Sequence, residues 1–188
     1  GNIYLNGSMG KAELEGTSTT FGAPLKAVKR SYIMMLKSSD QGKTWTDPKD
    51  VTGDVLIKKD GSFFAVCPGT GLTTQSGRII MPLYTTRHTV AIFSDDNGET
   101  YGKPVPVFDT VLDDRDVGLC VFGESGLIAT SFNNTLEFQR ENMPQTQECF
   151  DYINSVSPED EAEALGISFR ISNDCGETFG KIYKSPVS

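Results

Sequence analysis

One eight-residue pattern occurs three times in this chain of 188 residues. Its consensus is Ser-x-Asp-x-Gly-x-Thr followed by an aromatic residue, and five fixed positions arise by chance only about once per million starts. The copies occupy residues 38–45, 94–101 and 172–179. Recurrence of one short unit predicts a repeat architecture, in which similar supersecondary units pack against their neighbours.

Each copy is predicted to form the turn of a β-hairpin. A short apolar run precedes every copy, at residues 32–36, 90–93 and 167–171. The Asp of the pattern can close the turn by accepting backbone N–H bonds, and the Gly supplies a positive φ angle. The aromatic residue begins the returning strand and can pack its ring between layers. We therefore interpret the pattern as structural at Ser38, Asp40, Gly42, Thr44, Trp45, Ser94, Asp96, Gly98, Thr100, Tyr101, Ser172, Asp174, Gly176, Thr178 and Phe179.

This pattern is the Asp-box, or BNR repeat, and the chain resembles the sialidase (neuraminidase) family. Asp-boxes alone are not specific, because they also occur in other propellers and in sorting receptors. Two further segments favour sialidases. Residues 63–72, FFAVCPGTGL, are similar to the family's GPGxG segment, and residues 77–84, GRIIMPLY, are similar to the strand that follows it. The chain thus looks like a fragment of a bacterial exo-α-sialidase.

The resemblance implies an all-β fold, a β-propeller of four-stranded antiparallel blades, and the strand pattern agrees. We expect about two and a half blades, at about residues 1–52, 63–108 and 115–188. The sialidase propeller has six blades, so the remaining blades of the parent chain are expected partners. The expected strands are 2–8, 30–38, 71–74, 77–84, 88–94, 101–107, 117–122, 126–132, 165–172 and 179–183.

A small helical insertion is expected at about residues 135–164, where the strand pattern stops. Ser157 and Pro158 form a helix start signal, with acidic residues following in the first turn. Two interpretations remain open. The insertion is either a helical cap that packs on its own blade or a lid that shapes the ligand side.

Strand direction separates the two rims of such a fold. Because consecutive strands alternate in direction, the Asp-boxes mark one rim and the loops between second and third strands lie on the other. In sialidases the sugar binds on the rim opposite the boxes. The resemblance therefore places Phe64, Thr70 and Arg87 on the substrate rim.

Arg115 is the candidate for binding the sialic acid carboxylate. Its segment can be aligned with the family's F-R-I-P-x-L motif, whose Arg holds that carboxylate, and a planar guanidinium fits a carboxylate with two bonds. Two departures weaken the match, because Val117 replaces the Pro and the family's motif lies in an earlier blade. The alternative is a rim arginine paired with Asp113, Asp114 or Asp116.

The other catalytic groups that the resemblance implies are a Tyr nucleophile with its Glu, an Asp acid and two more arginines. The Tyr, its Glu and the two arginines lie in later blades of the family. Asp151 lies in the loop that corresponds to the acid, but it is more simply a solvated residue of the insertion. The isolated chain is therefore expected to be inactive.

Charge and composition exclude several classes of function. Seventeen basic residues against 25 acidic ones give a net charge of -8, which argues against nucleic acid as a partner. One histidine and four cysteines without CxxC spacing predict no metal site and no cofactor, and the cysteines are either two disulfides or free thiols. No apolar run is long enough for a membrane-spanning segment. The resemblance implies an extracellular or periplasmic location.

Two functions remain open. The first, implied by the resemblance, is part of an exo-α-sialidase, a glycoside hydrolase that releases terminal sialic acid from sialylated glycans with retention, through a covalent tyrosyl intermediate. The second is a non-catalytic Asp-box propeller that binds glycans or proteins.

Overall fold

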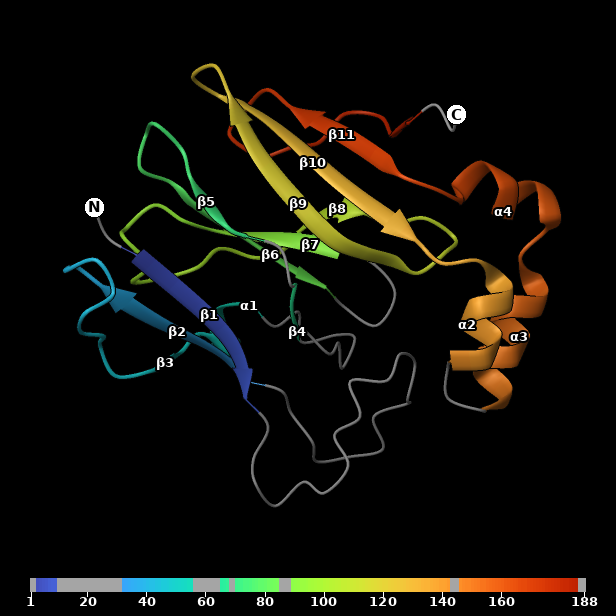
Figure 1. Cartoon of the computed structure of the whole chain (residues 1–188), viewed down its shortest axis with the longest axis horizontal. Helices are drawn as coiled ribbons and strands as arrows, with labels where there is room; N and C mark the ends of the chain where they lie inside the picture. The colour runs from blue at the N-terminus through green and yellow to red at the C-terminus, as the bar shows by residue number, and fades with distance from the viewer. Residues whose placement is uncertain are drawn as a thin grey trace.

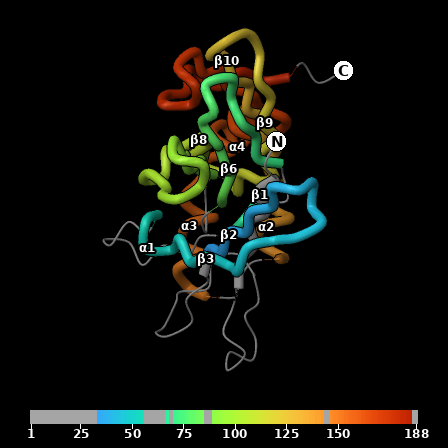
Figure 2. The backbone as a smooth tube through the Cα atoms, turned by 90° about the vertical axis from the view of Figure 1, so that its left-hand side faces the viewer, coloured from blue at the N-terminus to red at the C-terminus, as the bar shows by residue number. Residues whose placement is uncertain are grey.

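The computed structural model describes residues 3–9, 32–55, 65–67, 70–84, 89–142 and 146–185. These residues form three consecutive antiparallel sheets, which we call sheets 1, 2 and 3, and a group of helices (Figure 1). Sheet 2 lies between sheet 1 and sheet 3 in both views of the chain (Figures 1 and 2). The described part is thus a stack of three β-layers.

Every sheet is built from strands that follow one another along the chain. Sheet 1 contains β1 (Ile3–Met9), β2 (Tyr32–Ser38) and β3 (Lys49–Asp50), followed by the short helix α1 (Thr52–Val55). Sheet 2 contains β4 (Ala65–Val66), β5 (Leu72–Thr73), β6 (Ile79–Tyr84), β7 (Thr89–Ser94) and β8 (Val105–Phe108). Sheet 3 contains β9 (Asp114–Phe122), β10 (Gly126–Asn133), β11 (Ser168–Ser172) and β12 (Tyr183–Lys184). The expected antiparallel four-stranded order is therefore confirmed for sheet 3, which runs β12-β11-β10-β9.

Sheet 2 is buried on both faces, which makes it the centre of the stack. Alternate residues of β6 point to opposite faces, as in any strand. Ile79 and Met81 pack toward sheet 1, in a cluster with Ile33, whereas Ile80 packs toward sheet 3, in a cluster with Leu127. Burial of both faces explains why β6 and β7 are continuous apolar runs rather than alternating ones.

The outer strands are shorter than the sequence predicts. The strand expected at 101–107 begins only at Val105, and Pro104 and Pro106 on either side have no N–H for a ladder bond. The strand expected at 179–183 is reduced to Tyr183–Lys184, and before it the carbonyls of Phe179 and Gly180 accept bonds from the Arg170 guanidinium.

Three helices fill the expected insertion between β10 and β11. They are α2 (Leu136–Asn142), α3 (Gln147–Ser155) and α4 (Pro158–Ala164). The Ser157 hydroxyl accepts the N–H of Asp160 at 3.0 Å, so α4 begins at the residue that the sequence predicts. No helix of the described residues is long and apolar enough to cross a membrane.

Candidate functional site

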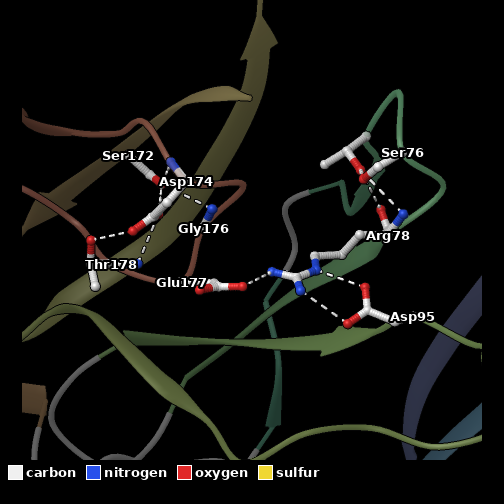
Figure 3. Close-up of polar contacts among 9 residues, drawn as sticks. Ser76, Arg78, Asp95, Ser172, Asp174, Gly176, Glu177 and Thr178 are labelled. Atoms are coloured by element: carbon white, nitrogen blue, oxygen red, sulfur yellow. Dashed lines mark hydrogen bonds and ion pairs between the residues drawn. The ribbon is translucent and has the colours of Figure 1, made fainter. Parts of the chain in front are cut away.

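The three Asp-boxes have one hydrogen-bond geometry. In each, the Ser hydroxyl donates to the Asp carboxylate at 2.7–2.9 Å and accepts the N–H of the Gly at 2.8–2.9 Å. The same carboxylate accepts the Thr N–H at 2.9 Å and the Thr hydroxyl at 2.5–2.6 Å. Figure 3 shows this arrangement around Asp174. Each carboxylate therefore closes one turn with bonds to its own loop.

Two consecutive residues in each box have a positive φ angle. The Gly has φ between 83° and 87°, and the residue before it, Gln41, Asn97 or Cys175, has φ between 55° and 63°. The carboxylate bonds to Ser and Thr hold this unusual backbone in place. They also lower the pKa of the carboxyl groups, to about 2 for Asp40, chiefly through the Thr44 hydroxyl and N–H. These carboxyl groups are ionised and stabilise their turns, so they are poorly suited to donate a proton.

The boxes are expected to serve stability rather than chemistry. Asp96→Ala removes the bonds to Ser94 and Thr100. The turn backbone, which has a positive φ, is then no longer stabilised by the carboxylate. We expect Tm to fall by a few degrees, as for other lost caps, while turnover per folded molecule of the full-length protein stays unchanged. Thermal unfolding measures Tm, and reaction rates divided by the concentration of folded protein measure turnover. Lost turnover at an unchanged Tm would instead move the box into the active site.

The aromatic residues of the boxes pack onto the preceding sheet. Tyr101 is 5% exposed and lies in the cluster between sheets 1 and 2, and Phe179 packs against the cluster between sheets 2 and 3. Trp45 was expected to pack in the same way, but it is 40% exposed. The expectation is wrong for this residue because no described sheet precedes sheet 1; its indole N–H bonds Gly42 O at 3.1 Å.

Ion pairs join neighbouring sheets along the same rim. The Arg78 guanidinium binds the Asp95 carboxylate through two nitrogens, at 2.7 and 3.0 Å, and the Glu177 carboxylate at 3.1 Å (Figure 3). Lys49 of sheet 1 pairs with Glu99 in the second box at 3.1 Å. The Arg78 contacts place the second and third boxes side by side, and the Lys49–Glu99 pair brings sheet 1 next to the second box. We call this side of the stack the box rim.

Arg115 lies at the opposite ends of the strands, on what we call the far rim. In sheet 3 the register pairs Arg115 with Phe132, while the other end of β9 meets the third box, where Cys175 N–H bonds Ser125 O. A β-bulge lies beside Arg115, where the β9–β10 register shifts between Thr130 and Phe132, and Asp116 has a φ of 48°. Such bulges re-aim the side chains next to them.

Asp113 and Tyr84 both contact the Arg115 guanidinium. Its Nε donates to the Asp113 carboxylate at 2.7 Å, and its Cζ lies 5.3 Å from the centre of the Tyr84 ring, over the ring. The Arg115 side chain is 22% exposed, whereas that of Asp113 is 6% exposed. Arg115 is thus paired with Asp113, which was one of the alternatives in the sequence. Part of its side chain is still exposed to solvent.

Burial dominates the electrostatics of the far rim. It raises the pKa of Asp113 to about 6, and the nearby Arg115 charge only partly opposes the rise. Burial also raises the pKa values of Asp114, which accepts both the N–H and the hydroxyl of Thr110, and of Tyr84. A buried carboxyl that titrates near neutrality beside an arginine is a feature of functional sites.

The helical insertion is anchored beside these residues. The Tyr152 hydroxyl of α3 donates to Val111 O at 2.8 Å, in the loop that leads to Asp113. At the base of the insertion, the Asn133 side chain bonds Ala164 O at 2.7 Å and accepts the Gly166 N–H at 2.8 Å. In Figure 1 the three helices extend beyond the far-rim end of β10. An open groove of about 630 Å³ lies between them, lined in part by Leu136, Arg140 and Ile153.

The other sequence candidates are only partly placed. Thr70 is exposed, and Phe64 and Arg87 lie outside the described residues. Asp151 accepts a bond from Gln147 one turn earlier on α3, as a solvated helix residue does. Among the described residues no group of His, Cys, Asp and Glu is arranged to hold a metal ion, and the four cysteines are free thiols.

Comparison with known proteins finds similarity to sialidases over part of the sequence and in the fold. No model of a protein family matches the chain. Human sialidase-3 is 34% identical, in a match that covers 37% of this chain and 20% of that protein. The solved structure of the Hadza microbial sialidase Hz136 superposes with a TM-score of 0.63 at 19% identity, covering 95% of this chain and 30% of that one.

The chain is similar in sequence and in fold to sialidases. It spans about a fifth of the length of human sialidase-3. A protein of unknown function from Dyadobacter fermentans shares the fold, with a TM-score of 0.57 at 17% identity, and the match covers 98% of this chain and 47% of that one. The sheets described above are therefore sialidase-like sheets, and they account for part of such a fold.

Sequence reasoning missed three residues of this sialidase-like fold. Tyr84 was placed only in the segment similar to the family, and nothing in its spacing indicates that it lies under Arg115. Arg78 and Arg170 join residues 99 and 63 positions away, respectively, so no local pattern reveals their partners. The pairing of Arg115 with Asp113 is separated by two residues and was visible as an alternative.

Proposed function

We propose that the protein to which this chain belongs is an exo-α-sialidase that releases terminal sialic acid from sialylated glycans with retention. The observation that carries the proposal is the partly exposed Arg115 guanidinium, held by a buried carboxylate on the rim opposite the Asp-boxes. The similarity to sialidases supports the same conclusion. We also propose that this parent protein is extracellular or periplasmic.

The chemistry of the substrate explains why an arginine is needed at this place. Sialic acid carries a carboxylate, and a guanidinium offers several N–H donors in one plane that match its two oxygens. Asp113 fixes the guanidinium through Nε, and the Tyr84 ring supports it from one side. A positioned arginine loses little conformational freedom when an anion binds, so more of the attraction contributes to affinity.

The remaining parts of the enzyme are assigned to other segments of the parent protein. We propose a propeller of six blades, in which sheets 1, 2 and 3 are the blades near residues 1–52, 63–108 and 115–188. The nucleophilic Tyr with its Glu, the acid and the further arginines would come from the other blades. The helical insertion would then border the sugar site, because Tyr152 ties it to the Asp113 loop.

Sugar binding is expected to strengthen as the pH falls through 6. The pKa of Asp113 is raised to about 6, so near pH 7.5 its negative charge opposes an anionic sugar next to Arg115. At pH 5 the carboxyl is neutral, and affinity for free sialic acid should be several-fold higher. Asp113→Asn, which keeps an oxygen acceptor for Arg115, should flatten this pH dependence. Calorimetric titration at both pH values measures it; an equally steep profile in the variant would assign the titration to another group.

Turnover of a fluorogenic sialoside by the full-length protein tests the proposed function. We expect saturable release of sialic acid, and a decrease in kcat/KM of about 100-fold for Arg115→Lys, because a lysine cannot make the two parallel bonds. Arg78→Lys on the box rim is the matched control and should retain the wild-type kcat/KM per folded molecule. A folded full-length protein without turnover would contradict the proposal.

A further inference from the structure

The loop that leads into β9 is held in one shape by its own hydrogen bonds. Thr110 donates its N–H and its hydroxyl to the Asp114 carboxylate, at 2.7 and 3.0 Å. The same hydroxyl accepts the Leu112 N–H at 3.1 Å. Leu112 is 2% exposed, and Asp113, which follows it, is 5% exposed. The direction of the Asp113 carboxylate toward Arg115 therefore depends on the shape of this loop.

The helical insertion contacts the same loop from outside. The Tyr152 hydroxyl of α3 donates to Val111 O at 2.8 Å, and the two residues are 41 positions apart in the chain. Both residues are half-buried, so part of this contact is shielded from water. Val111 lies two residues before Asp113. The bond to Tyr152 thus fixes the middle of the loop, whereas the bonds between Thr110 and Asp114 fix its ends.

The base of the insertion is fixed at the same end of sheet 3. Asn133 is the last residue of β10 and is paired with Asp114 in the β9–β10 register. Its side chain donates to Ala164 O at the end of α4 at 2.7 Å and accepts the Gly166 N–H at 2.8 Å. Figure 1 shows the three helices at this end of β10. An insertion anchored in this way holds Tyr152 at a fixed place beside the loop.

We propose that Tyr152 is a positioning residue of the sugar site, which holds the loop through Val111 in the shape that directs Asp113 toward Arg115. This inference rests on the proposed function and assigns one part of that site to the insertion. Tyr152 acts through the loop and not by contact with the sugar. The insertion is then a support of the sugar site, which differs both from a cap that serves its own blade and from a lid over the ligand.

The charge state of Asp113 reports on the shape of the loop. Burial raises its pKa to about 6, while Arg115 opposes the rise and the neighbouring carboxylates add to it. The titratable and charged groups that face Asp113 or its partner are Arg115, Asp114, Asp116, Tyr84, Cys67 and Tyr152. Burial raises the pKa of Tyr84, and it raises that of Cys67 to about 11, so both are uncharged near pH 6.

Loss of the Tyr152 hydroxyl should lower the pKa of Asp113. The loop is then free to move outward and admit water, which reduces the burial that disfavours the charged carboxylate. The pKa should therefore fall from about 6 toward the ordinary value of about 4. At pH 5 the carboxyl would be ionised in the variant but neutral in the wild type, and its charge would oppose an anionic sugar.

Tyr152→Phe in the full-length protein tests the proposal, because it removes one hydroxyl and keeps the ring. We expect the dissociation constant for free sialic acid, measured by calorimetric titration, to rise about fivefold at pH 5 and about twofold at pH 7.5. The effect is smaller at pH 7.5 because Asp113 is ionised there in both proteins. Tyr101→Phe, between sheets 1 and 2 at the box rim, is the matched control and should change neither constant. Wild-type affinity in Tyr152→Phe, or an equal loss at both pH values, would overturn the proposal.

Asp113→Ala shows whether Tyr152 acts through this carboxylate. In the Asp113→Ala background, Tyr152→Phe should change the dissociation constant by less than about 1.5-fold, because both substitutions remove the same support of Arg115. Equal factors with and without Asp113 would mean that the tyrosine acts on the fold in general, which contradicts the proposal.

The pKa of Asp113 tests the positioning without any ligand. Carbon-13 NMR of protein labelled at the aspartate side-chain carboxyls gives this pKa, with the signal assigned by its loss in Asp113→Asn. A fall toward about 4 in Tyr152→Phe would support the proposal, and an unchanged value near 6 would overturn it. A wild-type protein that binds no sialic acid would contradict the proposed function instead, and this titration would still decide the role of Tyr152.

Discussion

The 188-residue chain on its own is expected to release no sialic acid from a sialoside above the uncatalysed rate. Its resemblance to sialidases supplies one candidate carboxylate-binding arginine, Arg115, and no Tyr–Glu pair. Removal of a single member from a cooperating catalytic set lowers kcat by about 10⁴ to 10⁶.

A fluorogenic sialoside measured under single-turnover conditions is sensitive enough to test this expectation. The full-length protein, assayed at the same molar concentration, is the matched positive control. Saturable release by the purified chain that disappears in Arg115→Ala would contradict the expectation. It would mean that side chains interpreted here as structural, with Tyr84 the first to consider, perform the chemistry.

Arg170→Ala on β11, the neighbour of the short outer strand β12, is expected to cause a large loss of stability. The Arg170 guanidinium donates to Gly180 O, Val107 O and Phe179 O at 2.5–2.7 Å, and so joins sheet 2 to sheet 3. Its removal leaves three carbonyls without these donors. We expect the free energy of unfolding to fall by about 3 kcal/mol, since hydrogen bonds to charged groups contribute about 1.5–3 kcal/mol each and neighbouring losses overlap.

Arg170→Lys keeps the positive charge but removes the planar guanidinium, so it separates the effect of charge from that of hydrogen-bond geometry. An ammonium group is compact and cannot reach three carbonyls that lie around a planar guanidinium, so this variant should recover less than half of the loss. Urea unfolding followed by circular dichroism gives the free energy of unfolding of both Arg170 variants. Arg140→Lys, which also leaves the charge unchanged, is the control. Wild-type stability in Arg170→Lys would show that charge alone stabilises the contact between sheet 2 and sheet 3.

Local signals in the sequence predicted the turns and the central strands well. The Asp-box predicts its own turn because every bond that closes it lies within seven residues, as between Ser94 and Thr100. Ser157 and Pro158 likewise predicted the start of α4. The ends of the outer strands could not be predicted in this way. Arg170 contacts both of these segments, and its bond to Val107 spans 63 positions, so no local sequence pattern reveals it.

The candidate site was predicted in outline only. Alternating strand direction placed Arg115 on the rim opposite the boxes, and the register agrees. Its support by Tyr84, 31 positions earlier in the chain, comes from the contact of sheet 2 with sheet 3 and required the structure. The exposed Trp45 shows the converse. A local pattern assigned it to a buried position, but burial requires a preceding sheet that the described residues do not supply.

The position of sialic acid bound to the full-length protein tests the central claim most directly. A crystal structure of that complex should place the sugar carboxylate within hydrogen-bond distance of the Arg115 guanidinium, on the far rim and beside Tyr84. The three box carboxylates should remain bonded to their own Ser and Thr residues. A sugar bound on the box rim, or one whose carboxylate lies away from Arg115, would contradict the account.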